Sequence, residues 1–319
     1  MPPAAAHGGD GARVARALGL PLDQILDLSQ SLNPVARDPR LVLTRHLGAI
    51  GRYPDPEPAT EALASVMRVD PRRVLLTNGG AEAISLVTIQ LGGSVNEPEF
   101  SLHPRGGGPR WRSNPHSPSG VLAPREERAA VWDEAFYPLA TGRWTRGDEG
   151  AVVVGSLTKL LACPGLRVGY VLGEPAFIDA CRRDQPMWSL NSLACEALAD
   201  LLAPVDLAYE SAAVGALREE LRALLEHHGL YARPSDANWV LVERAGLREV
   251  LAHESIVVRD CASFGLAGVT RIAVPGRDGL ARLDVALSHL GEWLKKSAAD
   301  TSPIVEAIHP EEGDSDGYN

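Results

Sequence analysis

The sequence has few cysteines and no long apolar run. Only four of its 319 residues are cysteines, and they form neither a CxxC pair nor a spacing typical of metal ligands. We therefore expect free, buried thiols in a reducing compartment and no metal site. No apolar run reaches membrane-spanning length, and the first residues lack the basic and apolar regions of a secretion signal. The cytoplasm is the expected location, without contact to a membrane.

The chain also lacks an excess of positive charge. Its 31 lysines and arginines are outnumbered by 41 aspartates and glutamates, which gives a net charge of -10. A basic surface for nucleic acid is therefore not expected. Hydrophobic residues make up 45% of the chain, which is long enough to bury a large core. The composition indicates a soluble globular protein with one large and one smaller domain.

Short apolar runs alternate with amphipathic stretches along most of the chain. Strands are predicted at 74–76, 152–154, 168–172, 239–242, 256–258 and 270–274. Helices are predicted near 12–18, 59–67, 81–90, 206–228, 247–253 and 279–296, and residues 174–202 are expected to be mostly helical. Residues 104–120 are rich in Gly, Pro, Arg and Ser, which favours a loop. The alternation predicts an α/β fold with a largely parallel sheet.

Four regions are expected from these patterns. They are an N-terminal arm at 1–35, a large domain at 36–205, a small C-terminal α/β domain at 206–298 and an acidic tail at 299–319. The tail has few apolar residues and is predicted to be disordered.

The most informative feature is a lysine that follows a buried strand. Lys159 ends Gly155-Ser156-Leu157-Thr158-Lys159, directly after the apolar run at 151–154, and Arg167 follows shortly after it. A lysine amine can form a Schiff base with the aldehyde of pyridoxal 5'-phosphate (PLP), while hydroxyls and a guanidinium bind the phosphate. The pattern therefore indicates a PLP site, in which Lys159 is catalytic. A solvated surface lysine is the alternative.

Further short blocks occur in order along nearly the whole chain. They are His7–Gly9, Ser29–Pro34, Tyr53–Pro56, Asn78–Glu82, Asn114–Gly120, Asp133–Phe136, Ser156–Lys159, Pro186–Asn191 and Val258–Cys261. In this order and spacing they resemble the fold-type I PLP enzymes of the aminotransferase class I/II group. Within that group the chain is most similar to the threonine-phosphate decarboxylases of cobalamin biosynthesis and to the histidinol-phosphate aminotransferases. The first block, Trp188–Asn191 and Arg259–Phe264 lean toward the decarboxylases.

The resemblance implies a PLP-dependent transferase fold of the aspartate aminotransferase type. Its large domain would hold a mostly parallel sheet between helices, and a small α/β domain would follow. The implied cofactor is PLP and the implied substrate is a small phosphorylated amino acid. The implied assembly is a homodimer with shared active sites.

The resemblance also assigns roles around the cofactor. Asp133, at a strand end, would pair with the pyridine nitrogen and keep it protonated; a helix N-cap is the alternative. Backbone N–H groups of Gly80 and Ala81 would bind the phosphate at a helix N-terminus. The other phosphate ligands would be Ser156, Thr158 and Arg167.

Five more residues resemble family positions that face the substrate or the neighbouring subunit. Tyr53 would reach the phosphate of the neighbouring subunit's cofactor, and a surface tyrosine is the alternative. Arg271 would bind the substrate α-carboxylate as a bidentate fork. His7, Ser31 and Asn191 would lie on the substrate side, the first two near its phosphate.

The sequence departs from the family at several of these positions. Ser117 stands where the family has an asparagine that bonds the ring hydroxyl, so the bond is lost or bridged by water. His103 stands where a tyrosine stacks on the pyridine ring, and an exposed loop histidine is the alternative. Phe136 replaces a tyrosine of some aminotransferases. Residues 101–113 are too short for the helix–strand unit that relatives place there, so a sheet strand is expected to be missing or replaced. The arginines in this segment would bind an anionic substrate or be solvated.

Three functions remain open at this stage. The first is decarboxylation of O-phospho-L-threonine to (R)-1-amino-2-propanol O-2-phosphate for the cobalamin nucleotide loop. The second is transamination of histidinol phosphate or a related amino acid, in which Lys159 removes the α-proton. The third is a degenerate PLP-fold protein that binds a ligand without turnover. One fold can host all three functions, so the expected fold does not discriminate among them.

Overall fold

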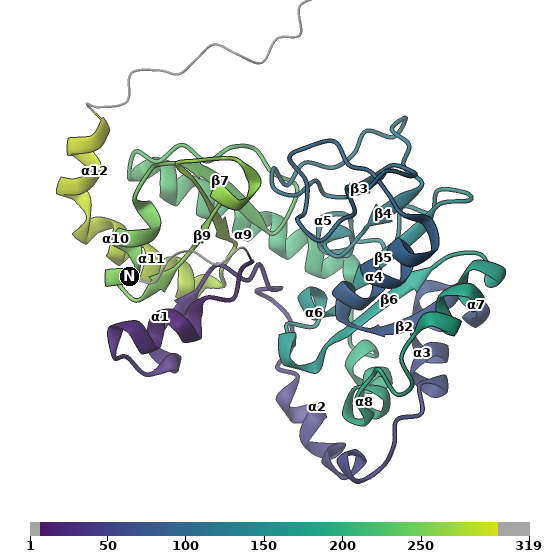
Figure 1. The fold of residues 1–319 in the computed structure, drawn as a ribbon. Coiled ribbons are helices and arrows are strands. Elements are labelled where there is room, and N and C mark those ends of the chain that lie inside the picture. Colours follow the sequence, from purple (N-terminus) through teal and green to yellow (C-terminus); the bar gives the residue numbers. More distant parts are fainter. Residues whose placement is uncertain (1–6, 299–319) are drawn as a thin grey trace, which may run out of the picture.

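The computed structural model describes residues 7–298, which form two α/β parts of unequal size (Figure 1). The larger part contains a five-stranded sheet in the order β2-β6-β5-β4-β3. Its strands are β2 (Val74–Asn78), β3 (Trp111–Ser113), β4 (Val131–Asp133), β5 (Val152–Ser156) and β6 (Val168–Leu172). The smaller part contains a three-stranded sheet in the order β7-β10-β9. Its strands are β7 (Trp239–Glu243), β9 (Arg259–Asp260) and β10 (Val269–Ala273).

The large sheet is mostly parallel, as predicted. Strands β3, β4 and β5 pair in parallel, and β6 is antiparallel to both β5 and β2. Four strands therefore run in one direction and β6 runs against them. All five residues of β6 and the valines of β5 are buried. Strands covered on both faces take continuous apolar sequences, which is why these runs were recognisable.

Helices cover both faces of the large sheet. On one face Leu76 and Trp132 join a core with Leu63 of α3 (Glu57–Met67) and Leu198 of α8 (Ser192–Leu202). On the other face α4 (Gly79–Leu91) and α7 (Pro175–Asp184) pack on the sheet through a separate apolar cluster. The short helices α2 (Arg40–Arg45), α5 (Tyr137–Thr141) and α6 (Leu157–Leu160) complete this part.

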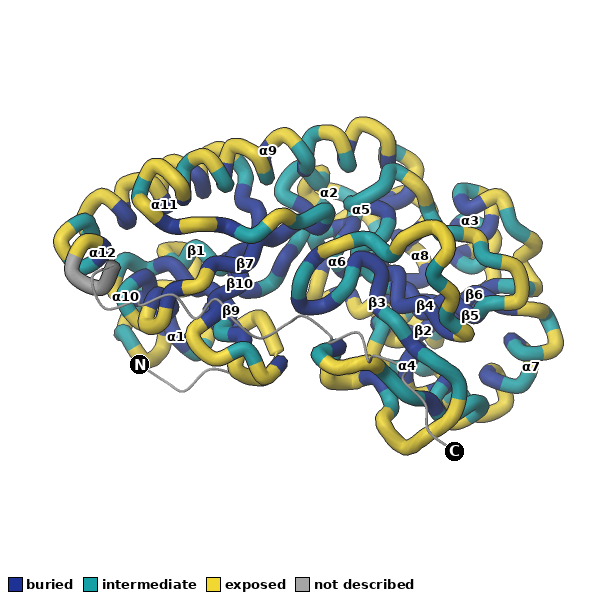
Figure 2. The backbone as a smooth tube through the Cα atoms, turned by 90° about the horizontal axis from the view of Figure 1, so that it is seen from above, coloured by how far each residue is buried: buried dark blue, intermediate teal, exposed yellow. Residues whose placement is uncertain are grey.

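The smaller part includes the N-terminal arm. Here β1 (Leu26–Asp27) pairs in parallel with β8 (Ile256–Val257), so the arm is joined to the C-terminal part. The surrounding helices are α1 (Gly11–Leu18), α9 (Leu207–His227), α10 (Leu247–His253), α11 (Arg277–His289) and α12 (Gly291–Ala298). Figure 2 shows α9 and α11 with exposed outer faces and buried residues turned toward the small sheet.

Two sequence predictions of secondary structure were wrong in part. Residues 104–120 were predicted to be a loop, but they contain the strand β3. Its first residue, Trp111, is 1% exposed and pairs in register with Val131. The predicted last helix is divided into α11 and α12 near Leu290. The predicted tail lies outside the described residues. Within residues 7–298 no helix is long and apolar enough to cross a membrane, and all four cysteines are free and buried.

Candidate active site

A cavity of about 270 Å³ is lined by residues from both parts of the molecule. Asp133 and Ser156 reach it from the ends of β4 and β5, and Lys159 follows β5. Arg259 and Arg271 reach it from the small sheet. The carboxyl ends of parallel strands meet at one edge of a sheet, which is where such folds bind their ligands. The remaining predicted residues that line this cavity are His7, Gly80, Ala81, Ser117, Thr158 and Arg167.

Lys159 is held within this cavity by the N-terminal arm. Its Nζ donates a hydrogen bond to the carbonyl of Gln30 at 2.7 Å. Burial lowers the pKa of the amine to about 8, and the charges of Arg271, Arg259 and Arg167 act in the same direction. A lysine with a lowered pKa carries a larger uncharged, nucleophilic fraction near neutral pH. The surface-lysine alternative is therefore wrong.

An anion site lies where α4 begins. Gly79 has φ 76°, and a Cβ built on it would lie 2.3 Å from Nη2 of Arg167. A Cβ on Gly169 would lie 2.4 Å from the Gly79 carbonyl carbon. These glycines let β6 and the Arg167 guanidinium approach the helix N-terminus, where backbone N–H groups attract anions. The Thr158 hydroxyl is buried and makes no hydrogen bond within the described chain. The arrangement fits the phosphate of PLP.

Asp133 is fixed at the end of β4 by two donors. Its Oδ1 accepts from the backbone N–H of Ala135 at 3.0 Å, and its Oδ2 lies 2.9 Å from Nε2 of His103. The following helix α5 is capped by Phe136 instead, so the N-cap alternative for Asp133 is wrong. Its carboxylate lines the cavity and fits the ring nitrogen of PLP.

The histidine predicted to stack on the ring occupies a different place. His103 is 3% exposed, so it is not an exposed loop residue, and it is absent from the cavity lining. Phe100 lines the cavity instead, with its ring centroid 5.5 Å from that of His103. The aromatic face available to a bound ring from this segment is therefore Phe100. The sequence analysis assigned no role to Phe100, which lies three residues before His103.

Two arginines dominate the substrate side. Arg259 and Arg271 are direct cross-strand partners in β9 and β10, so their side chains lie on one face of the small sheet. The Arg271 guanidinium lies over Trp239 at 4.7 Å, and that of Arg259 over Phe264 at 4.5 Å. Burial, followed by the charge of Arg259, lowers the pKa of Arg271 to about 9. Two adjacent buried cations favour an anionic ligand.

The role of Arg259 was missed by sequence reasoning, although it begins a quoted block. His7 also lines the cavity, and its ring centroid lies 6.0 Å from that of Phe100. Burial, and after it Arg259, lowers the pKa of His7.

Besides His103, three predicted residues do not line the cavity. Ser31 is buried beside it, and its carbonyl accepts from Asn238 at 2.7 Å. Asn191 caps α8 by accepting from the Ala194 N–H, and it donates to the Leu166 carbonyl at 2.8 Å. Its contact is therefore with the turn that carries Arg167. Tyr53 is 77% exposed and stacks on Trp188 at a centroid distance of 4.7 Å. Its role in a neighbouring subunit stays a prediction.

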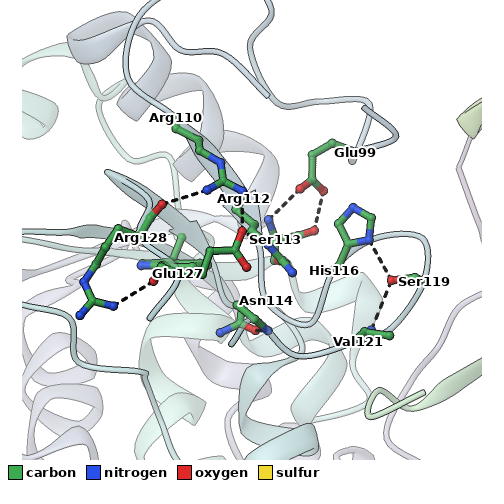
Figure 3. Close-up of polar contacts among 12 residues, drawn as sticks. Glu99, Arg110, Arg112, Ser113, Asn114, His116, Ser119, Val121, Glu127 and Arg128 are labelled. Atoms are coloured by element: carbon green, nitrogen blue, oxygen red, sulfur yellow. Dashed lines mark hydrogen bonds and ion pairs between the residues drawn. The ribbon is translucent and has the colours of Figure 1, made fainter. Parts of the chain in front are cut away.

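The arginines of the shortened segment are engaged elsewhere. Arg110 and Arg112 both pair with Glu127, and Arg110 also donates to the Arg128 carbonyl (Figure 3). Arg105 donates to backbone carbonyls of its own loop. None of the three lines the cavity. They hold loops together, so the prediction that they bind substrate or are merely solvated was wrong.

Comparison with known proteins agrees with this geometry. Residues 111–290 match the family described as aminotransferase class I and II. The threonine-phosphate decarboxylase of Salmonella typhimurium is 29% identical over 81% of this chain and 88% of its own length. The histidinol-phosphate aminotransferase 1 of Dechloromonas aromatica is 26% identical over 82% of this chain and 88% of its own.

Solved structures share the fold. The L-threonine-O-3-phosphate decarboxylase from Porphyromonas gingivalis superimposes with a TM-score of 0.73 at 22% identity, over 84% of this chain and 100% of that one. The histidinol-phosphate aminotransferase from Sinorhizobium meliloti, solved with PLP, has a TM-score of 0.75 at 16% identity, over 89% and 95% of the two chains. Because the matched family segment covers more than half of the sequence, the chain belongs to the aminotransferase class I and II family of PLP-dependent enzymes.

Proposed function

We propose that the protein decarboxylates O-phospho-L-threonine and releases (R)-1-amino-2-propanol O-2-phosphate, a precursor for cobalamin. The observation that carries the proposal is the cross-strand pair of Arg259 and Arg271, which faces a cavity with a separate anion site at the start of α4. PLP would use that separate site, and both guanidiniums line the part of the cavity that the substrate would enter. A phosphorylated amino acid supplies two anions, a carboxylate and a phosphate.

The residues that would hold PLP fit the group in kind and place. Lys159 would bond its aldehyde, Asp133 would pair with the ring nitrogen, and Phe100 would face the ring. Ser117 would approach the ring hydroxyl. The phosphate ligands would be the backbone of Gly80 and Ala81 with the side chains of Ser156, Thr158 and Arg167. When bound, PLP supplies an electron sink for the electron pair left at Cα after bond cleavage.

The chain's own residues would orient the substrate. Arg271 would bind the α-carboxylate as a fork, and Arg259 with His7 would bind the phosphate. The Cα–carboxylate bond breaks, carbon dioxide leaves and a proton is then added at Cα. Lys159, whose amine has a lowered pKa, can carry that proton.

A second candidate is transamination of histidinol phosphate, and the family match and the second relative favour it. That substrate has a phosphate but no carboxylate, so only one of the two buried guanidiniums would gain an anion from it. In this reaction Lys159 would remove the proton from Cα, and the amino group would stay on the cofactor.

Carbon dioxide release and absorbance, measured on one sample, separate the two reactions. The protein with PLP is mixed with O-phospho-L-threonine, and L-threonine serves as the substrate control without phosphate. We expect carbon dioxide release with the phosphorylated substrate, while the absorbance of lysine-bound PLP persists. Conversion to pyridoxamine phosphate without carbon dioxide would support transamination instead.

A pair of variants tests the phosphate assignment. Arg259→Met should raise KM for O-phospho-L-threonine by about 10- to 100-fold, the effect of losing one charge-assisted contact. Arg277→Met, at an exposed arginine paired with Glu220, is the control. An unchanged KM in Arg259→Met would contradict the proposed phosphate site.

A further inference from the structure

One carboxylate joins two stretches of the N-terminal arm. Asp27 ends β1, and its Oδ1 accepts from the backbone N–H and the hydroxyl of Ser29 at 2.9 and 2.6 Å. Its Oδ2 accepts from the Gly11 N–H at 3.1 Å and from Nε2 of Gln30 at 2.7 Å. The two oxygens of an ionised carboxylate accept about four hydrogen bonds, so both are fully used. Asp27 therefore ties the start of α1 to the segment that follows β1.

Two glycines of the arm lie directly against this segment. The Ser29 hydroxyl accepts from the Gly9 N–H at 2.8 Å. A Cβ built on Gly8 would lie 2.0 Å from the Ser29 carbonyl oxygen, so a residue with a side chain cannot pass here without displacing that carbonyl. This close approach brings His7 and Gly8 into the wall of the cavity.

The same carboxylate fixes the group that holds Lys159. The Gln30 side chain donates to Asp27, and the Gln30 carbonyl accepts from Nζ of Lys159 at 2.7 Å. A charged amine donates more strongly than an uncharged one, so this bond favours the ammonium form. Burial and three arginines lower the pKa of Lys159, whereas the charge of Asp27 raises it. The arginines are Arg271, Arg259 and Arg167.

We propose that Asp27 is a positioning residue that holds the N-terminal arm in the wall of the cavity and, through Gln30, holds the amine of Lys159 in place. Asp27 is anchored in the smaller part of the molecule by the pairing of β1 with β8, whereas Lys159 follows β5 of the larger part. The carboxylate thereby relates the substrate side of the cavity to the reactive lysine. The proposal rests on Lys159 as the residue that bonds PLP and, for its effect on turnover, on the proposed phosphate contact of His7.

Asp27→Asn tests the proposal with little change in side-chain size. An amide has only one accepting oxygen, and its NH₂ group would face two of the donors that now bond the carboxylate. Half of the contacts are therefore lost together with the charge. Asp23→Asn is the matched control, because Asp23 is an exposed aspartate of the same arm.

The readout is the rate of PLP attachment, followed by absorbance after PLP is mixed with the PLP-free protein at several pH values. The pH midpoint of this rate should fall by about one pH unit in Asp27→Asn, the effect of one hydrogen bond to a charged group, and stay unchanged in Asp23→Asn. A variant that only admits water to the site would move the midpoint upward, toward the ordinary pKa of lysine. An unchanged or higher midpoint in Asp27→Asn would overturn the proposal.

Two further measurements separate this proposal from the proposed function. Attachment of PLP in Lys159→Ala would refute the lysine assignment on which both depend. The KM for O-phospho-L-threonine should rise about tenfold in Asp27→Asn, because the arm no longer holds His7 at the substrate phosphate. A wild type that does not turn over this substrate would refute the proposed reaction, and the attachment rates would still decide the role of Asp27.

A measurement on the wild type covers the case in which Asp27→Asn does not fold. The N–H of Gly11, the first residue of α1, has no partner within the helix, and that of Gly9 lies in an exposed stretch. Both should nevertheless exchange with solvent at least about tenfold more slowly than in an unstructured chain, because Asp27 and Ser29 accept from them. Exchange of either N–H at the unstructured rate, measured by nuclear magnetic resonance, would also overturn the proposal.

Discussion

The lowered pKa of Lys159 predicts how fast the protein captures PLP at different pH. Covalent attachment requires the uncharged amine. With a pKa of about 8, the uncharged fraction is about one tenth at pH 7, one half at pH 8 and nine tenths at pH 9. The attachment rate should therefore rise about fivefold from pH 7 to 8 and less than twofold from pH 8 to 9. An amine at its ordinary pKa would give nearly tenfold per pH unit over this range.

Arg271→Met tests the physical cause of this shift. Burial is the largest contribution to the lowered pKa of Lys159, and the charge of Arg271 is the second. Removing the guanidinium should move the midpoint to higher pH, while the buried amine stays below its ordinary pKa. The assay is stopped-flow absorbance after mixing PLP with the PLP-free protein across a pH series. A wild-type rate that still rises tenfold between pH 8 and 9 would refute the reasoning.

Three further predictions concern other parts of the molecule. Gly79→Ala should destabilise the protein by about 1–3 kcal/mol and weaken PLP binding, because the φ of Gly79 is 76° and the added Cβ would displace the Arg167 guanidinium. Thermal unfolding measures the stability and a PLP titration measures the binding, and an unchanged stability and affinity would contradict the close approach of Arg167 to Gly79. A mixture of inactive Tyr53→Ser and Lys159→Ala subunits should regain activity through hybrid dimers, and light scattering should show dimers; monomers without regained activity would refute the shared site. Burial raises the pKa of Glu134 to about 7, so its contribution to stability is lost as pH rises from about 4.5 to 7. In Glu134→Gln the free energy of unfolding should fall less between about pH 4.5 and 8 than in the wild type, by up to about 3 kcal/mol, as measured by urea unfolding. A variant with the wild-type pH dependence would argue against the raised pKa of Glu134.

The central lysine site could be predicted because its signals are local. A continuous apolar run marks β5, and Lys159 follows it within a few residues. Asp133 likewise ends a short buried strand, so its position at the edge of the sheet follows from the strand itself. Parallel strands that end at one edge bring such residues together without further information.

The substrate side was harder to predict because it depends on distant pairings. Arg259 lies in a two-residue strand, and only its register with Arg271 brings the two guanidiniums to one face. The strand β3 was hidden among Gly, Pro and Arg residues, and only pairing with β4 defines it. Roles for Ser31 and Asn191 came from resemblance alone, and neither side chain lines the cavity.

The choice between Phe100 and His103 shows why irregular segments resist sequence reasoning. In a strand or helix, spacing decides which side chains share a face, but the loop around these residues has no period. Its conformation is instead set by Arg105, whose guanidinium satisfies four backbone carbonyls that a strand ladder would otherwise bond. That clasp turns Phe100 toward the cavity and His103 toward Asp133. A chain can therefore be short at this position and still support the cofactor site, provided that one side chain meets the hydrogen-bonding needs of the loop. The arginine that sequence reasoning assigned to substrate or solvent is, in the folded protein, the residue that holds the loop in place.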